Sequence, residues 1–143
     1  MSVAEIEGVQ AALRAEHSAI WGYGVVGAAV DAQSRQSVRD VDAAHRAGRD
    51  ELADLIRSVG GDPDPAEASY ELPFPVADAA GGLRLAAFLE AGVANGYAYA
   101  ISQADSARGK EFCLDALVYA ALRQTSWQQL AGVTPVTPEF PGL

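Results

Sequence analysis

ALRAEHSAIWGYGVV at residues 12–26 and AAFLEAGVANGYAYA at residues 86–100 share the spaced motif Glu-x5-Gly-Tyr inside two otherwise apolar segments. Aligned without a gap, at an offset of 74 residues, they have identical residues at four positions: Ala12 and Ala86, Glu16 and Glu90, Gly22 and Gly96, Tyr23 and Tyr97. Matching alanines carry no information in alanine-rich helices, but a glutamate and a Gly-Tyr pair at the same spacing do. The repeat therefore predicts two related helical hairpins, each beginning with a helix that carries this glutamate and this Gly-Tyr pair.

Apolar residues recur at helical spacing in four segments, which predict helices over about 3–30, 35–59, 78–104 and 107–130. Short polar breaks separate the two helices of each hairpin. Residues 60–77 are rich in proline, have no helical period and are too long for a tight turn, so we expect a crossover that packs along the bundle. Residues 131–143 are expected to be a non-helical tail because of their prolines. Two hairpins joined by one long crossover predict an all-α, ferritin-like four-helix bundle in a single domain, residues 1–143.

Composition limits the classes of partner. The 143 residues carry a formal net charge of −9, and the ten basic residues are scattered. We therefore expect no nucleic-acid partner, which would need clustered Lys and Arg. No apolar run reaches the roughly 18 residues of a membrane span, and the acidic N-terminal sequence lacks the pattern of a signal peptide. A cytoplasmic protein without a membrane partner is expected, with its one cysteine, Cys113, as a buried apolar residue.

The hairpin geometry places an arginine level with each repeated glutamate. In an antiparallel hairpin, residues equally far from the turn lie at the same depth, so Arg49 is level with Glu16 and Arg123 with Glu90. Both glutamates lie on apolar stripes and should face the core, where an unpaired carboxylate costs several kcal/mol. We therefore predict two buried ion pairs, Glu16–Arg49 and Glu90–Arg123. Four further residues are expected to complete the hydrogen bonding: Tyr23, His45, Tyr97 and Tyr119.

This order of glutamates and level positions resembles the ferritin and rubrerythrin superfamily. The segments AEHSAIWGYGVVGA, AAHRAGRDEL, YELPFPV and FPGL are more closely similar to a family of small bacterial ferritin-like proteins whose function is not established. The superfamily resemblance implies two single glutamates, matched here by Glu16 and Glu90, and two Glu-x-x-His motifs, which together bind two irons or manganese ions. The motif positions fall on residues 49–52 and 123–126, where arginine replaces both glutamates and neither histidine is present. The resemblance thus implies a degenerate metal site with charge pairs in place of metal.

These observations favour a non-enzymatic structural or interaction module without a cofactor, and they leave two alternatives open. Glu16, His45 and Glu90 could bind iron or manganese as a reduced, oxidoreductase-like site. The space where the metals would lie could instead hold a small anion between Arg49 and Arg123.

A homodimer is the expected assembly. His17 and Trp21 lie on one flank of the first helix, and Phe88 can serve the same face in the second half. Ferritin-like relatives commonly associate through their long helices, so this flank is the predicted contact.

Overall fold

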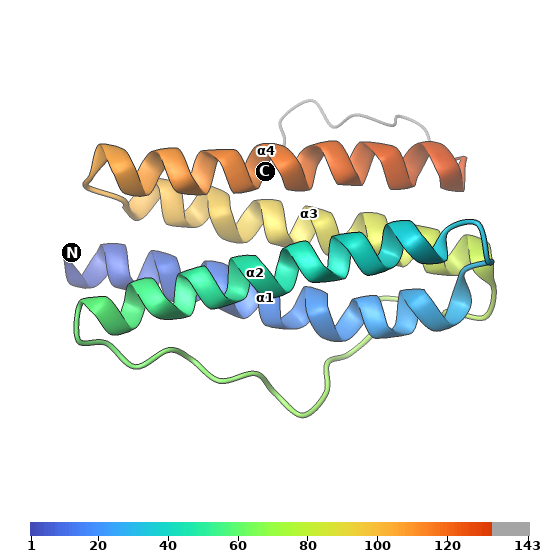
Figure 1. Ribbon diagram of the computed structural model, residues 1–143, viewed down its shortest axis with the longest axis horizontal. Coiled ribbons are helices and arrows are strands. Elements are labelled where there is room, and N and C mark those ends of the chain that lie inside the picture. Colours follow the sequence, from blue (N-terminus) through green and yellow to red (C-terminus); the bar gives the residue numbers. More distant parts are fainter. Residues whose placement is uncertain (133–143) are drawn as a thin grey trace.

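The structure, a computed structural model, describes residues 1–132. Its helices are α1 (Val3–Ala29), α2 (Arg35–Ser58), α3 (Ala79–Gln103) and α4 (Ala107–Ala131). They lie side by side in an elongated bundle (Figure 1). The predicted all-α bundle of two hairpins is therefore confirmed, whereas residues 133–143 of the predicted tail lie outside the described residues.

Side-chain caps fix where three of the helices begin. The side chains of Ser2, Asp78 and Ser106 each accept a hydrogen bond from the backbone N–H three residues later, at 3.1, 2.8 and 3.0 Å. Each bond satisfies a donor that the helix itself leaves free. Glu5, three residues after Ser2, accepts a hydrogen bond from the Ser106 hydroxyl at 3.3 Å, which ties the start of α1 to the start of α4.

The repeated glycines allow α1 and α3 to approach each other closely. A Cβ atom at Gly22 would lie 2.6 Å from the Leu89 side chain, and one at Gly96 would lie 2.8 Å from Ala15 Cβ. Leu89 and Ala15 are themselves separated by the 74-residue offset, so the two contacts are equivalent. The halves of the chain therefore meet reciprocally at the centre of the core, as expected for a duplicated hairpin.

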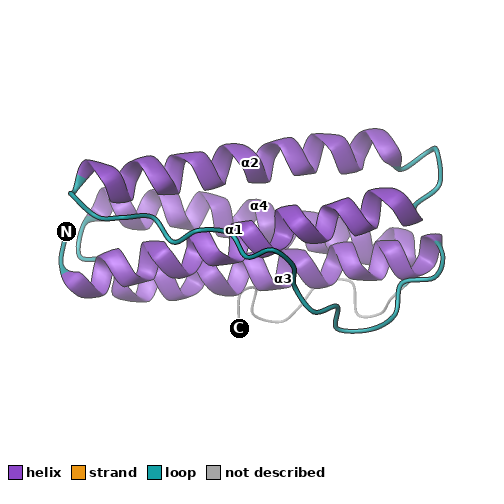
Figure 2. Cartoon of the chain, turned by 90° about the horizontal axis from the view of Figure 1, so that it is seen from below, coloured by secondary structure: helices purple, strands orange, loops and turns teal. Residues whose placement is uncertain are grey.

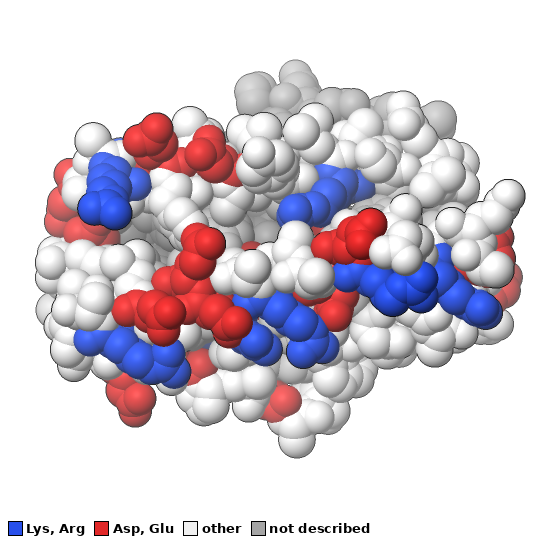
Figure 3. Space-filling view, viewed as in Figure 1, with Lys and Arg blue, Asp and Glu red and all other residues white. Residues whose placement is uncertain are grey.

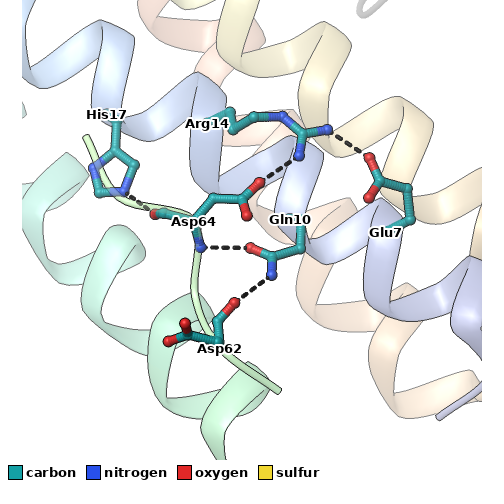
Figure 4. A network of polar contacts seen from close by, with 6 residues as sticks. All are labelled: Glu7, Gln10, Arg14, His17, Asp62 and Asp64. Atoms are coloured by element: carbon teal, nitrogen blue, oxygen red, sulfur yellow. Dashed lines mark hydrogen bonds and ion pairs between the residues drawn. The ribbon is translucent and has the colours of Figure 1, made fainter. Parts of the chain in front are cut away.

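The crossover between α2 and α3 runs along the outside of the bundle (Figure 2). Its first part is fastened to α1 (Figure 4). The Gln10 amide donates to the Asp62 carbonyl at 2.7 Å and accepts from the Asp64 N–H at 2.9 Å. Arg14 pairs with the Asp64 carboxylate at 2.5 Å, and a ring nitrogen of His17 lies 2.9 Å from the Asp64 carbonyl oxygen.

Aromatic contacts fasten the rest of the crossover. Trp21 packs on Tyr70 with ring centroids 5.8 Å apart, and Phe88 meets Phe74 edge-on at 6.3 Å. The side chains that we assigned to a subunit contact thus face the crossover of their own chain. Contacts within one chain therefore account for the apolar side chains on this flank of α1.

The four helices do not contact one another equally. α1 packs against α2 and α3, and α3 packs against α4, whereas α2 and α4 barely touch. The core therefore lies between α1 and α3, and the space between α2 and α4 stays partly open.

Candidate functional site

His45 lies between the two repeated glutamates at the centre of the bundle. Its Nδ1 is 2.6 Å from Glu16 Oε2, and its Nε2 is 2.8 Å from Glu90 Oε1. All three residues, the core triad, are at most 3% exposed. A neutral imidazole has one N–H donor and an imidazolium has two, so a ring between two carboxylates favours the imidazolium, which donates from both nitrogens.

The electrostatics of the triad agree with this protonation. Burial acts to lower the pKa of His45, but hydrogen bonds to Glu16 and Glu90, together with their negative charges, raise it to about 9. His45 is therefore charged at neutral pH. The triad carries two carboxylates and one imidazolium, which leaves one excess negative charge in the core.

Each repeated tyrosine donates to the glutamate of the other half. Tyr97 OH donates to Glu16 Oε1 at 2.7 Å, and Tyr23 OH donates to Glu90 Oε1 at 2.6 Å. Burial raises the pKa of both phenols, and the adjacent carboxylate charges raise it further, so both remain protonated donors. The Glu-x5-Gly-Tyr motif thus has a physical purpose: its glycine lets α1 and α3 approach, and its tyrosine satisfies the opposite carboxylate.

Trp127 of α4 extends the network, and the sequence reasoning missed it. Its indole Nε1–H donates to Tyr23 OH at 3.0 Å, and the side chain is buried. A single large aromatic residue within the polar stretch RQTSWQQ was the available signal. One polar atom of the site, Glu90 Oε2, has no hydrogen-bond partner among the described residues.

The structure pairs the glutamates differently from the prediction. Neither expected Glu–Arg ion pair forms among the described residues. Arg49 Nε pairs instead with Asp50 at 2.8 Å, near the surface. The Arg123 guanidinium lies 5.8 Å from the centre of the Tyr119 ring, and Tyr119, which we expected in the core network, is 59% exposed.

The incorrect prediction of Glu–Arg pairs has a geometric cause. Distance from a turn gives depth along a helix, but it does not say which face a residue occupies. The buried face of α2 includes Val38, His45 and Leu52, which recur every seven residues. Arg49 lies to one side of that face, so His45, one turn nearer the start of α2, takes the central position.

The residues present do not fit a dimetal centre. His45 uses both ring nitrogens on carboxylates, so neither lone pair is available to a metal. A Cβ atom at Gly48, one turn after His45, would lie only 2.9 Å from Glu16 Oε1, so a ligand side chain has no room there. Among residues 1–132, no group of three or more His, Cys, Asp or Glu side chains is arranged to hold a metal ion. The alternative set of Glu16, His45 and Glu90 does come together, but as a hydrogen-bonded triad.

A cavity of about 370 Å³ lies beside the triad, between α2 and α4. Glu16, His45 and Tyr97 contribute to its wall, and Arg123 also lines it, whereas Arg49 does not. The predicted anion site between two arginines is therefore not assembled. None of the four described helices is long and apolar enough to cross a membrane.

Comparison with known proteins places these features in a family. The chain matches the model of a domain of unknown function, DUF4439, over residues 8–143. It is similar to the crystal structure of a conserved hypothetical protein, rv2844, from Mycobacterium tuberculosis, with 30% identity and a TM-score of 0.88 over 91% of this chain and 98% of that one. No curated protein sequence matches the chain.

A second solved structure indicates the fold. It is described as a ferritin-like, diiron-carboxylate protein from Bacillus anthracis str. Ames, and it is 23% identical with a TM-score of 0.67 over 91% of this chain and 96% of that one. This likeness confirms the ferritin-like arrangement of the bundle. The chain belongs to the DUF4439 family and has a ferritin-like fold.

Proposed function

We propose that this protein is a non-enzymatic, ferritin-like structural or interaction module in which the core triad takes the place of a dimetal centre. The observation that supports it is the position of His45, which lies between Glu16 and Glu90 with both ring nitrogens engaged. A protonated imidazole links the two carboxylates and repels a cation. The bundle is then held at its centre by charge-assisted hydrogen bonds, which are among the stronger ones in proteins.

The runner-up is a metal-binding, oxidoreductase-like protein with a reduced site. It is favoured by the meeting of Glu16, His45 and Glu90, which supply imidazole and carboxylate ligands. Metal binding at His45 requires a free lone pair, so the ring must lose a proton whose pKa is about 9 and release one carboxylate. Such a metal therefore competes with a proton that is held tightly at neutral pH.

Elemental analysis distinguishes the metal-free module from the metal-binding alternative. Untagged protein grown with iron and manganese supplied is compared with Glu16→Gln and with Asp42→Asn, a matched acidic residue of α2 that pairs with Arg46 outside the triad. We expect no stoichiometric metal in any of the three and a marked loss of stability in Glu16→Gln alone. Stoichiometric metal that disappears in Glu16→Gln and remains in Asp42→Asn would overturn the proposal and favour the oxidoreductase.

The expected setting is cytoplasmic and homodimeric, with no nucleic-acid partner. Support for a second copy now comes from α4, where Leu114, Val118 and Leu122 are 52, 45 and 59% exposed at intervals of one turn. Such a stripe is typical of a helix that packs against another surface. Light scattering after size exclusion should give the mass of a dimer that Val118→Glu converts to a monomer. A monomeric parent protein would contradict the dimer.

A further inference from the structure

The cavity between α2 and α4 has features that the core network does not explain. It exists because these two helices barely touch, and its wall includes the triad residues Glu16 and His45. Figure 3 shows the molecule hollowed between α2 and α4, with acidic side chains at the edge of the hollow. Phe112 and Tyr119 also line the cavity, which is therefore partly polar and partly aromatic.

Opposite charges line the two ends of this cavity. Glu51 of α2 and Asp115 of α4 lie at one end, and Arg123 lies two turns further along α4 from Asp115. Arg123 follows Asp115 by eight positions on α4, which is about 12 Å along the axis. None of these three residues forms an ion pair with another described residue. The cavity thus presents acidic groups at one end and a guanidinium at the other.

We propose that the α2–α4 cavity binds an elongated aliphatic zwitterion with an ammonium group at one end and a carboxylate at the other. The ammonium is favoured at the Glu51 and Asp115 end, where two carboxylates line the cavity. The carboxylate is favoured at Arg123, because the planar guanidinium can hold it with two hydrogen bonds.

Size and lining narrow the class of ligand further. A compact amino acid such as glycine carries adjacent charges and cannot contact both Asp115 and Arg123, whose positions on α4 are about 12 Å apart along the helix axis. The methylene groups between the charges would pack on Phe112, Tyr119 and the small residue Ala116. Basic amino acids and ω-amino acids share this chemistry. The site lies outside the triad's hydrogen bonds, so it does not depend on the proposed metal-free function.

Calorimetry and thermal shift on the parent protein test the proposal with five probes. 6-Aminohexanoate carries the two charges at opposite ends of a chain of five methylene groups; hexylamine and hexanoate each carry one charge, and glycine carries both on adjacent groups. L-Lysine adds an α-ammonium group and so distinguishes a basic amino acid from an ω-amino acid. We expect saturable binding of 6-aminohexanoate or lysine, at least tenfold tighter than that of the other three. Equal binding of hexylamine, or no saturable binding of either long zwitterion, would overturn the proposal.

Variants test the two ends separately. Arg123→Leu should weaken 6-aminohexanoate at least tenfold and leave hexylamine unchanged, whereas Glu51→Gln should weaken both. Arg46→Leu is the matched control, because Arg46 pairs with Asp42 and does not line the cavity. An Arg123→Leu protein that keeps its helical circular dichroism and its full affinity for 6-aminohexanoate would contradict the assignment. The probe series on the parent protein decides the question if a variant does not fold.

Discussion

Raising the pH from 6 to 9 should destabilise the protein by about 3 kcal/mol through His45 alone. The pKa of His45 is about 9 in the folded protein and 6.5 for an ordinary histidine, as in the unfolded chain. Between these values the folded state holds a proton that the unfolded state has lost. The stabilisation is therefore fully present below pH 6.5 and is lost as the pH rises towards and through 9, at about 1.4 kcal/mol per pH unit.

Urea unfolding at pH 6, 7, 8 and 9, followed by tryptophan fluorescence, gives the free energy of unfolding by linear extrapolation. The chain offers a matched pair of variants, because it has only two histidines. His45→Gln should flatten the pH dependence, whereas His17→Gln should keep it, since His17 contacts a backbone carbonyl of the crossover. A parent protein whose free energy of unfolding changes by less than about 1 kcal/mol over this range, or a His45→Gln variant with the parent slope, would refute the reasoning.

Three further predictions concern the core network, the packing of α1 on α3 and the buried thiol. Tyr23→Phe removes a buried donor to carboxylate and the acceptor of an indole N–H, so urea unfolding should show a loss of about 1–3 kcal/mol, against almost none for the half-exposed Tyr99→Phe. Gly96→Ala should destabilise by about 1–3 kcal/mol by forcing α1 and α3 apart, whereas Gly92→Ala, where a Cβ atom meets nothing within 4 Å, should stabilise by up to about 1 kcal/mol. Burial raises the pKa of Cys113 to about 11, so a thiol reagent should modify it much more slowly in the folded protein than in urea-unfolded protein at the same pH; equal labelling rates would contradict this.

Much of the fold could be predicted because its signals are local. Helical periodicity, the caps at Ser2, Asp78 and Ser106 and the long proline-rich connection all act within a few residues, and they determine where each helix begins and how the hairpins are joined. The internal repeat added one non-local prediction: the first helix of each hairpin carries a glutamate that faces the core. The two glycines of the repeat, Gly22 and Gly96, are consistent with the close packing of α1 on α3.

The partners of the glutamates could be predicted only in part: Tyr23, His45 and Tyr97 were expected in the network and are found there, whereas the arginines expected as charge partners are not. Pairing in the core depends on which face of each helix turns inward and on the angle at which helices cross. The depth of a residue along the bundle gives no information on either. His45 lies on the apolar face of α2. The position of a residue on this face, rather than its depth along the helix, indicates which residue of α2 turns towards the glutamates. The exchange of tyrosine donors between halves, and the bond from Trp127 to Tyr23, depend on the packing of three helices and have no local signature.

The protonation of His45 tests the central claim most directly. Nitrogen-15 NMR of the imidazole at pH 7, assigned by comparison with His45→Gln, reports the state of both ring nitrogens. The triad predicts that both Nδ1 and Nε2 carry a proton at this pH and that neither responds to added iron or manganese. A neutral ring, or a ring nitrogen whose signal is lost or shifted when metal is added, would contradict the replacement of a metal centre by the triad.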